Sequence, residues 1–193
     1  MPSDELQVQW DARYAKNNDS PQACRVLREF SHLLPKSGLA LDLACGMGGN
    51  ALWLAEQGLT TSAWDLSPVG INKLEERAKQ QSLSIDAKTR DIIAQPPAEN
   101  SFDVIVASYF LERALFPTLL AALKPAGLLF YETFVQDKPK GIGPSNPDYL
   151  LKQNELLEMG GELIIRVYRE EGLIGDTAEG CRNIAMLVAQ KQQ

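Results

Sequence analysis

Hydrophobic and polar positions along the 193-residue chain form two alternating patterns. Short, mostly apolar runs bounded by glycine, proline or charged residues are typical of buried strands. Between them, apolar residues recur every three or four positions, as they do on one face of a helix. These patterns predict strands at 39–44, 60–65, 84–91, 102–110 and 128–134, and helices around 10–14, from residue 21 onward, and at 50–57, 68–81 and 118–127.

Residues with special backbone preferences mark the ends of several predicted helices. Ser20 and Ser67 are expected N-caps, and each precedes a proline at the first helical position, where a missing N–H costs little. Gly58 is the expected C-terminal stop of the helix at 50–57. Asn146 follows a Gly/Pro-rich segment and is expected to cap a further helix.

The alternation of strands and helices predicts right-handed βαβ crossovers and a parallel sheet with helices on both faces. The chain then changes pattern, because 162–170 and 181–190 are predicted strands without a helix between them. Strands joined in this way run antiparallel, at one edge of the sheet. We therefore predict an α/β fold with a doubly wound, Rossmann-like, mostly parallel seven-stranded sheet and an antiparallel last strand. No repeat or low-complexity linker divides the chain, so one domain, 1–193, is expected.

Composition narrows the classes of function. Hydrophobic residues make up 45% and charged residues 23% of the chain, as in ordinary globular proteins. A net charge of −6 argues against binding nucleic acid or an anionic membrane through the overall field. Cys24, Cys45 and Cys181 have no C-x-x-C spacing, which predicts neither disulfides nor a metal site and favours a reduced, cytoplasmic setting. No signal peptide is recognisable, and no apolar run is long enough to span a bilayer.

The segment LDLACGMGGNA, residues 41–51, indicates a ligand-binding loop after the first strand. Gly46, Gly48 and Ala51 have the G-x-G-x-x-G/A spacing of a dinucleotide site. Asp65 follows the next strand, where a carboxylate for the ribose of a nucleotide is expected. Asp42, however, would repel a pyrophosphate held by this loop.

Acidic residues at the ends of three predicted strands favour a cationic nucleoside instead. S-adenosylmethionine carries a sulfonium and an ammonium group and no phosphate, so that Asp42 would attract it. Asp65 is expected to accept the ribose hydroxyls, and Asp91 the adenine amino group. The glycines allow the backbone to approach the methionine portion closely.

Five segments in order carry a family resemblance: LDLACGMGGNALWLAEQG, AWDLS, RDI, FDVIVASYFL and LKPAGLLFYETF. They resemble the successive motifs of class I S-adenosylmethionine-dependent methyltransferases. WDARY, GGN, AWD and RNIAMLVAQK are similar to the small tellurite-resistance and thiopurine-type members, although this chain lacks the His-Arg pair that the tellurite group carries before its last strand. The resemblance implies S-adenosyl-L-methionine as cofactor and in-line transfer of methyl to a small molecule, with thiol or chalcogen compounds among the expected acceptors.

The resemblance also implies which positions form the site. The expected cofactor-binding residues are Arg13, Asp42, Ala44, Gly46, Gly48, Asn50, Asp65, Leu66, Asp91, Ile92 and Ser108. The substrate-side candidates are Tyr109, Glu132 and Arg182, with a solvated or capping role as the plainer interpretation of Glu132. Residues 1–38 are expected to form N-terminal helices and a lid, 39–134 the cofactor-binding core, and 135–193 a substrate loop and the C-terminal strands. The loop 135–149 is interpreted as a second cover over the pocket.

Two other functions stay open at this point. An NAD-dependent oxidoreductase fits the glycine spacing but needs a catalytic pair such as Y-x-x-x-K, which the chain lacks. A non-catalytic module that binds S-adenosylmethionine would share the pocket, because in-line transfer depends on positioning and demands few special side chains.

Overall fold

A seven-stranded sheet with the order β3-β2-β1-β4-β5-β7-β6 organises residues 3–193, the part of the chain that the computed structural model describes. The strands are β1 (Leu39–Leu43), β2 (Thr60–Asp65), β3 (Ile85–Thr89), β4 (Phe102–Ser108), β5 (Leu123–Phe134), β6 (Ile164–Arg169) and β7 (Ile184–Gln190). The α-helices are α1 (Ser3–Lys16), α2 (Arg25–Glu29), α3 (Gly49–Glu56), α4 (Pro68–Gln80), α5 (Phe116–Ala122) and α6 (Glu155–Met159), with 3-10 turns η1 (Ser31–Leu33), η2 (Arg113–Leu115) and η3 (Pro147–Tyr149). The expected domain begins at residue 1, and its first two residues lie outside the described part.

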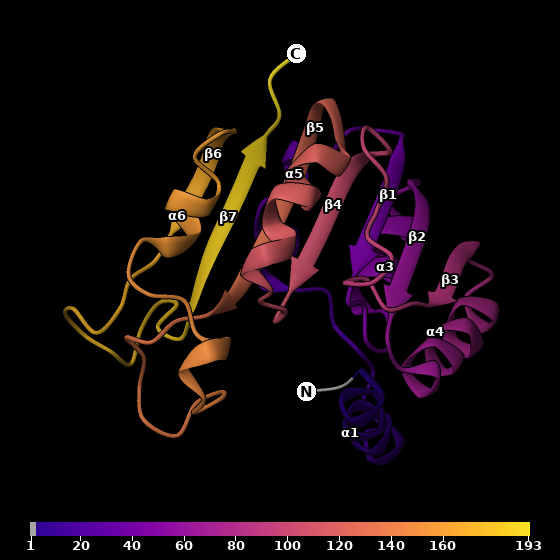
Figure 1. Cartoon of the computed structure of the whole chain (residues 1–193), viewed down its shortest axis with the longest axis horizontal. Helices are drawn as coiled ribbons and strands as arrows, with labels where there is room; N and C mark the ends of the chain where they lie inside the picture. The colour runs from indigo at the N-terminus through magenta and orange to yellow at the C-terminus, as the bar shows by residue number, and fades with distance from the viewer. Residues whose placement is uncertain (1–2) are drawn as a thin grey trace.

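The predicted topology is confirmed. Strands β1 to β5 pair in parallel, whereas β7 lies between β5 and β6 and runs antiparallel to both. Helices α5 and α6 pack on one face of the sheet, and α2, α3 and α4 pack on the other. Figure 1 shows the parallel strands ending at one edge, with α1 lying just beyond it. In such sheets ligands bind at this carboxyl edge.

The two N-terminal helices differ from the prediction. The first is the longer, Ser3–Lys16, and the second has only five residues, Arg25–Glu29. Ser20 and Pro21 do not begin a helix, because the chain after α1 turns at Asn17, whose side chain accepts the N–H of Asp19 at 2.8 Å. Helix α2 starts only where residues far away in the chain bind it: Asn50 accepts the N–H of Cys24, and Glu132 accepts the N–H of Val26. A local sequence pattern does not contain such contacts.

The ends of the other helices agree in part with those predicted from the sequence. The side chain of Ser67 accepts the N–H of Gly70 and caps α4, as predicted, and Gly58 follows α3 with a left-handed φ of 89°. Helix α5 ends at Ala122 rather than continuing to 127, because Leu123 already pairs with β4. The expected helix after Asn146 is a single 3-10 turn, Pro147–Tyr149.

Candidate functional site

The loop between β1 and α3 is tightly turned at the carboxyl edge of the sheet. Its backbone is left-handed at Ala44, Gly46 and Gly48, with φ values of 54°, 54° and 85°. A Cβ at Gly48 would lie 2.2 Å from a methyl carbon of Leu74, and one at Gly46 would lie 3.0 Å from the hydroxyl oxygen of Tyr14. Glycine is therefore strongly favoured at Gly48, by its conformation and by the space around it, and to a smaller degree at Gly46.

Carboxylates occupy N–H groups that a pyrophosphate would need in this loop. Asp65 Oδ2 accepts the N–H of Gly46 at 2.7 Å, and Asp42 Oδ2 accepts the N–H of Ala51, in the first turn of α3, at 3.0 Å. A dinucleotide site leaves such groups free to face phosphate oxygens. Two acidic side chains in their place leave these N–H groups unavailable to phosphate oxygens, and the ionised form of either side chain attracts a cationic ligand.

Asp42 and Asn50 form a buried polar network beneath the loop. The Asn50 amide donates to Asp42 Oδ1 at 3.1 Å and to Ser108 Oγ at 3.0 Å, and its oxygen accepts the N–H of Cys24 at 2.8 Å. Asp42 is fully buried, and burial raises its pKa to about 7, against the opposing effect of its hydrogen bonds. Both Asp42 oxygens thus bind α3, so that this residue shapes the loop from below.

Asp65 and Asp91 lie at neighbouring strand ends. Asp65 Oδ1 also accepts the N–H of Ser67 at 2.8 Å, and burial, followed by repulsion from Asp11, raises the pKa of Asp65. Asp91 Oδ1 accepts two N–H groups of the turn that follows it, at 3.0 and 3.1 Å. A carboxylate has about four acceptor positions, so each residue retains capacity for a ligand. Of their expected neighbours, Leu66 is half-buried, and Ile92 is buried in the core.

Helix α1 covers this end of the sheet (Figure 1). The Lys73 ammonium in α4 donates to the carbonyl of Tyr14 at 2.7 Å and thereby holds the end of α1. The Tyr14 phenol lies against Gly46, whereas the Arg13 guanidinium is 5.0 Å above the ring of Trp10 and exposed. Tyr14, rather than the predicted Arg13, is the residue of α1 that the structure brings to the loop.

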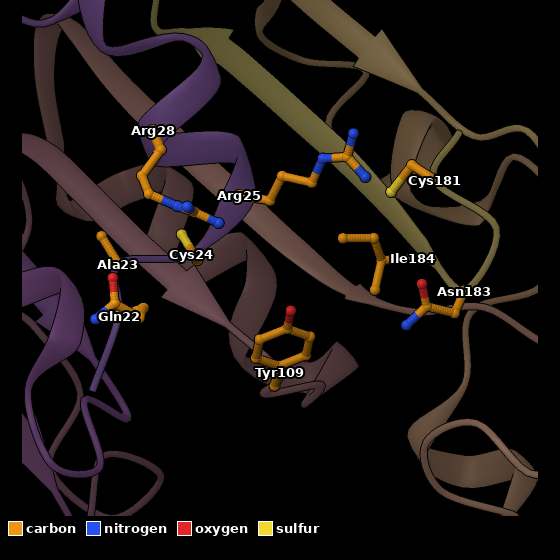
Figure 2. Close-up of a pocket in the computed structure, with 9 residues that line it drawn as sticks. All are labelled: Gln22, Ala23, Cys24, Arg25, Arg28, Tyr109, Cys181, Asn183 and Ile184. Atoms are coloured by element: carbon orange, nitrogen blue, oxygen red, sulfur yellow. The ribbon is translucent and has the colours of Figure 1, made fainter. Parts of the chain in front are cut away.

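A cavity of about 380 Å³ lies on the other side of Ser108, where β4 ends. Figure 2 shows its walls: α2 and the segment before it, the tip of β4, and the start of β7. The lining residues are Gln22, Ala23, Cys24, Arg25, Arg28, Tyr109, Cys181, Asn183 and Ile184. Tyr109 has a left-handed φ of 56°, rare for a bulky residue, and its ring centroid is 5.0 Å from that of Phe134. A strained backbone conformation at a strand tip makes Tyr109 a candidate functional position.

The other two substrate-side candidates have different surroundings. Glu132 is fully buried under the cavity, and its Oε2 accepts the N–H of Val26 in α2 at 2.6 Å, a capping contact as the plainer interpretation expected. Arg182 does not line the cavity. Its guanidinium instead donates to carbonyls of the loop before β7, those of Gly172, Ile174, Asp176 and Glu179.

Several cavity residues could not be assigned to the site from the sequence. Arg25 and Arg28 lie outside every family motif, and Asn183 lies in a strand segment whose resemblance gives this residue no role. Only the packing of α2 beside the start of β7 brings the three together. Within residues 3–193, no cluster of three or more histidine, cysteine, aspartate or glutamate side chains is arranged to hold a metal ion. The described helices also include none with the length and apolar character needed to span a membrane.

Comparison with known proteins favours a methyltransferase over an NAD-dependent oxidoreductase. Residues 40–127, which include most of β1, the glycine loop and the acids Asp42, Asp65 and Asp91, match the family model of the methyltransferase domain. These matches, together with TehB-like relatives and structural neighbours, support a class I S-adenosylmethionine-dependent methyltransferase. The cofactor of this family is S-adenosyl-L-methionine, and the carboxylates that occupy the loop N–H groups agree with it.

Curated relatives of this methyltransferase family match it over part of the chain. The ubiquinone biosynthesis O-methyltransferase of Methylobacterium nodulans is 33% identical over 106 residues, 52% of this chain and 43% of the relative. The probable S-adenosyl-L-methionine-dependent methyltransferase TehB of Haemophilus influenzae is 34% identical over 87 residues, 44% of this chain and 30% of the relative. The chain thus matches less than half the length of either.

Solved structures confirm the methyltransferase fold over nearly the whole chain. TehB from Haemophilus influenzae superposes with a TM-score of 0.72 and 24% identity, covering 95% of this chain and 67% of that chain. A TehB-like methyltransferase from Corynebacterium glutamicum gives a TM-score of 0.61 with 19% identity and 98% coverage of both chains. At these identities the likeness concerns the fold alone.

Proposed function

We propose that this protein transfers the methyl group of S-adenosylmethionine to a small-molecule acceptor. The observation that carries the proposal is the use of loop N–H groups by Asp42 and Asp65, which leaves the site acidic and without a phosphate cradle. When bound, the cofactor supplies an electrophilic methyl group on a sulfonium. Residues 1–193 are proposed to act as one domain.

The cofactor is proposed to lie along the carboxyl edge from β3 to β4. Asp65 would accept the ribose hydroxyls through its remaining acceptor positions, and Asp91, with Leu66 and Ile92 beside the two acids, would hold the adenine. Ala44, Gly46, Gly48 and Ser108 would surround the methionine portion, with Asn50 fixing Ser108 from below. Tyr14 lies against Gly46, so it is a stronger candidate than Arg13 for closing over the cofactor.

The acceptor is proposed to bind in the cavity beside Tyr109. The cavity starts one residue beyond Ser108, so that an acceptor within it can approach a methyl group held over β4. No hydrogen bond or ion pair joins the Arg28 guanidinium to another residue between 3 and 193, which leaves it available for an anionic group of the acceptor. The loop 135–149 is proposed as a cover, since Gly143 packs on the Phe134 ring that contacts Tyr109.

Ligand-dependent thermal shift tests the cofactor. S-adenosylhomocysteine at a hundredfold excess over its dissociation constant is expected to stabilise the fold by about 2.7 kcal/mol, and NAD is expected to have no effect. Asp65→Asn is expected to reduce the shift, whereas the matched variant Asp86→Asn, exposed on β3, retains it. A shift with NAD and none with S-adenosylhomocysteine would refute the proposal.

Turnover separates an enzyme from a binding module. Radiolabelled S-adenosylmethionine is incubated with a panel of thiols, phenols, carboxylates, amines and selenium or tellurium oxyanions, and labelled products are collected. Enzyme-dependent labelling of any small molecule supports methyl transfer. Strong binding of S-adenosylhomocysteine with no labelled product in any class favours the non-catalytic alternative.

A further inference from the structure

The Glu132 carboxylate is incompletely satisfied although it is fully buried. Its Oε2 accepts the N–H of Val26 at 2.6 Å, and its Oε1 has no hydrogen-bond partner among residues 3–193. Capping α2 requires only one of the two oxygens. A buried carboxylate oxygen without a donor is costly, and native proteins keep such groups mainly where they have a function.

Tyr109 connects this carboxylate with the cavity. It follows Ser108, which pairs in register with Glu132, and its N–H donates to the Glu132 carbonyl at 2.9 Å. Figure 2 shows its hydroxyl directed into the cavity. Burial, then the charge of the Glu132 carboxylate and a direct side-chain interaction with it, raise the pKa of the phenol, which places the two side chains close together. The phenol therefore stays protonated at neutral pH and is able both to accept and to donate a proton.

We propose that Tyr109 and Glu132 form a proton-accepting pair, and that the acceptor of the methyl group is a protic nucleophile, a hydroxyl or a thiol. This inference rests on the proposed function. The acceptor O–H or S–H donates to the phenol oxygen while the phenol proton passes to Glu132 Oε1. The acceptor atom then forms a bond to the methyl carbon while the carbon–sulfur bond of the sulfonium breaks. The electron pair of the broken bond stays on sulfur and neutralises its charge. The proton remains on Glu132 through the transfer and returns to solvent once the product has left the cavity.

The charges around the pair are compatible with this role. The titratable and charged groups that face it from neighbouring elements are Cys24, Arg25 and Arg28 of the α2 segment, Cys181 before β7, and Asp42 of β1. Burial raises the pKa of both thiols, so neither competes as a thiolate at neutral pH. Arg25 pairs with Glu29, whereas the Arg28 guanidinium remains available to stabilise an acceptor that becomes anionic.

A matched pair of thiols tests the proton transfer. Benzyl mercaptan is mostly protonated at neutral pH, whereas 4-nitrobenzenethiol is already ionised. Tyr109→Phe and Glu132→Gln are expected to lower kcat for the protonated thiol by about 10²- to 10⁴-fold, the usual contribution of a general base, and to leave kcat for the ionised thiol nearly unchanged. The amide oxygen that Glu132→Gln introduces still accepts from Val26, and Tyr168→Phe, on β6, is the control for loss of a hydroxyl elsewhere.

The pH profile adds a readout that a structural role would not change. In both variants the rate with benzyl mercaptan is expected to rise about tenfold per pH unit, following the ionised fraction of the thiol, while the wild-type rate changes less. Equal losses for the two thiols, or no loss, would overturn the proposal. So would methylation confined to acceptors without a transferable proton, or binding of S-adenosylhomocysteine with neither hydroxyls nor thiols methylated. Absence of that binding in the wild type would instead refute the proposed function.

Discussion

Asn50 gives the most quantitative test of how the site is held together. Its amide makes three hydrogen bonds: two buried ones, to Asp42 and from the N–H of Cys24, and a partly buried one to Ser108. Asn50→Ala leaves Asp42 Oδ1 and the Cys24 N–H without partners, and each orphaned buried group costs about 1–3 kcal/mol. Alanine recovers up to about 0.7 kcal/mol, because it favours the helix more than asparagine does. The expected loss is therefore about 1–5 kcal/mol of unfolding free energy.

Urea unfolding followed by circular dichroism measures this loss, with Asn18→Ala as the control. Asn18 is exposed between α1 and α2, so its truncation is expected to change stability by less than about 0.5 kcal/mol. A loss below about 1 kcal/mol for Asn50→Ala, or one equal to that of the control, would refute the network. An unchanged dependence on urea concentration shows that both variants unfold from the same compact state.

Three further predictions concern the same region. Because burial raises the pKa of Asp42 to about 7, the folded protein keeps a proton that the unfolded chain loses near pH 4, so the unfolding free energy should fall between pH 4 and 7. Asp42→Asn should remove roughly 4 kcal/mol of this pH-dependent change in urea titrations. An unchanged pH slope in the variant would contradict this. Gly48→Ala should destabilise the fold more than Gly58→Ala. Both changes add left-handed backbone strain of about 1–2 kcal/mol, but Gly58 faces open space whereas a Cβ at Gly48 also meets Leu74. Equal shifts in the melting temperature would count against this. Ser67→Ala should cost about 1 kcal/mol by removing the α4 cap, and a neutral result in urea unfolding would show that the cap is dispensable.

The sheet was accessible from the sequence because its signals are local. The prediction for β2 matches Thr60–Asp65 residue for residue, and β1 ends one residue earlier than predicted. Strands β1, β4 and β7 are mostly apolar runs, and the order of strands and helices then fixes the parallel topology. The acids Asp42, Asp65 and Asp91 could be placed at strand ends for the same reason.

Residues whose partners lie far away in the chain were harder to interpret. Helix α2 begins where Asn50, 26 positions later, accepts the N–H of Cys24. Glu132 is buried because Val26, 106 positions earlier, donates to it, whereas composition alone predicts an exposed glutamate. Arg182 was expected to meet substrate because arginine binds anions, but the carbonyls of a folded loop occupy it. A sequence pattern gives the type of a side chain, and tertiary contacts decide what it binds.

Strand β7 has a consequence for how the molecule is made. It is synthesised after the other six strands, yet it lies inside the sheet and pairs with β5 from Leu128–Gln190 to Phe134–Ile184. Until it docks, β5 presents an open edge that is able to pair with other chains. Because β7 is antiparallel, its first residues also form one wall of the cavity beside Tyr109. A chain stopped before β7 would therefore lack one wall of this cavity, and the edge of its β5 strand would stay uncovered.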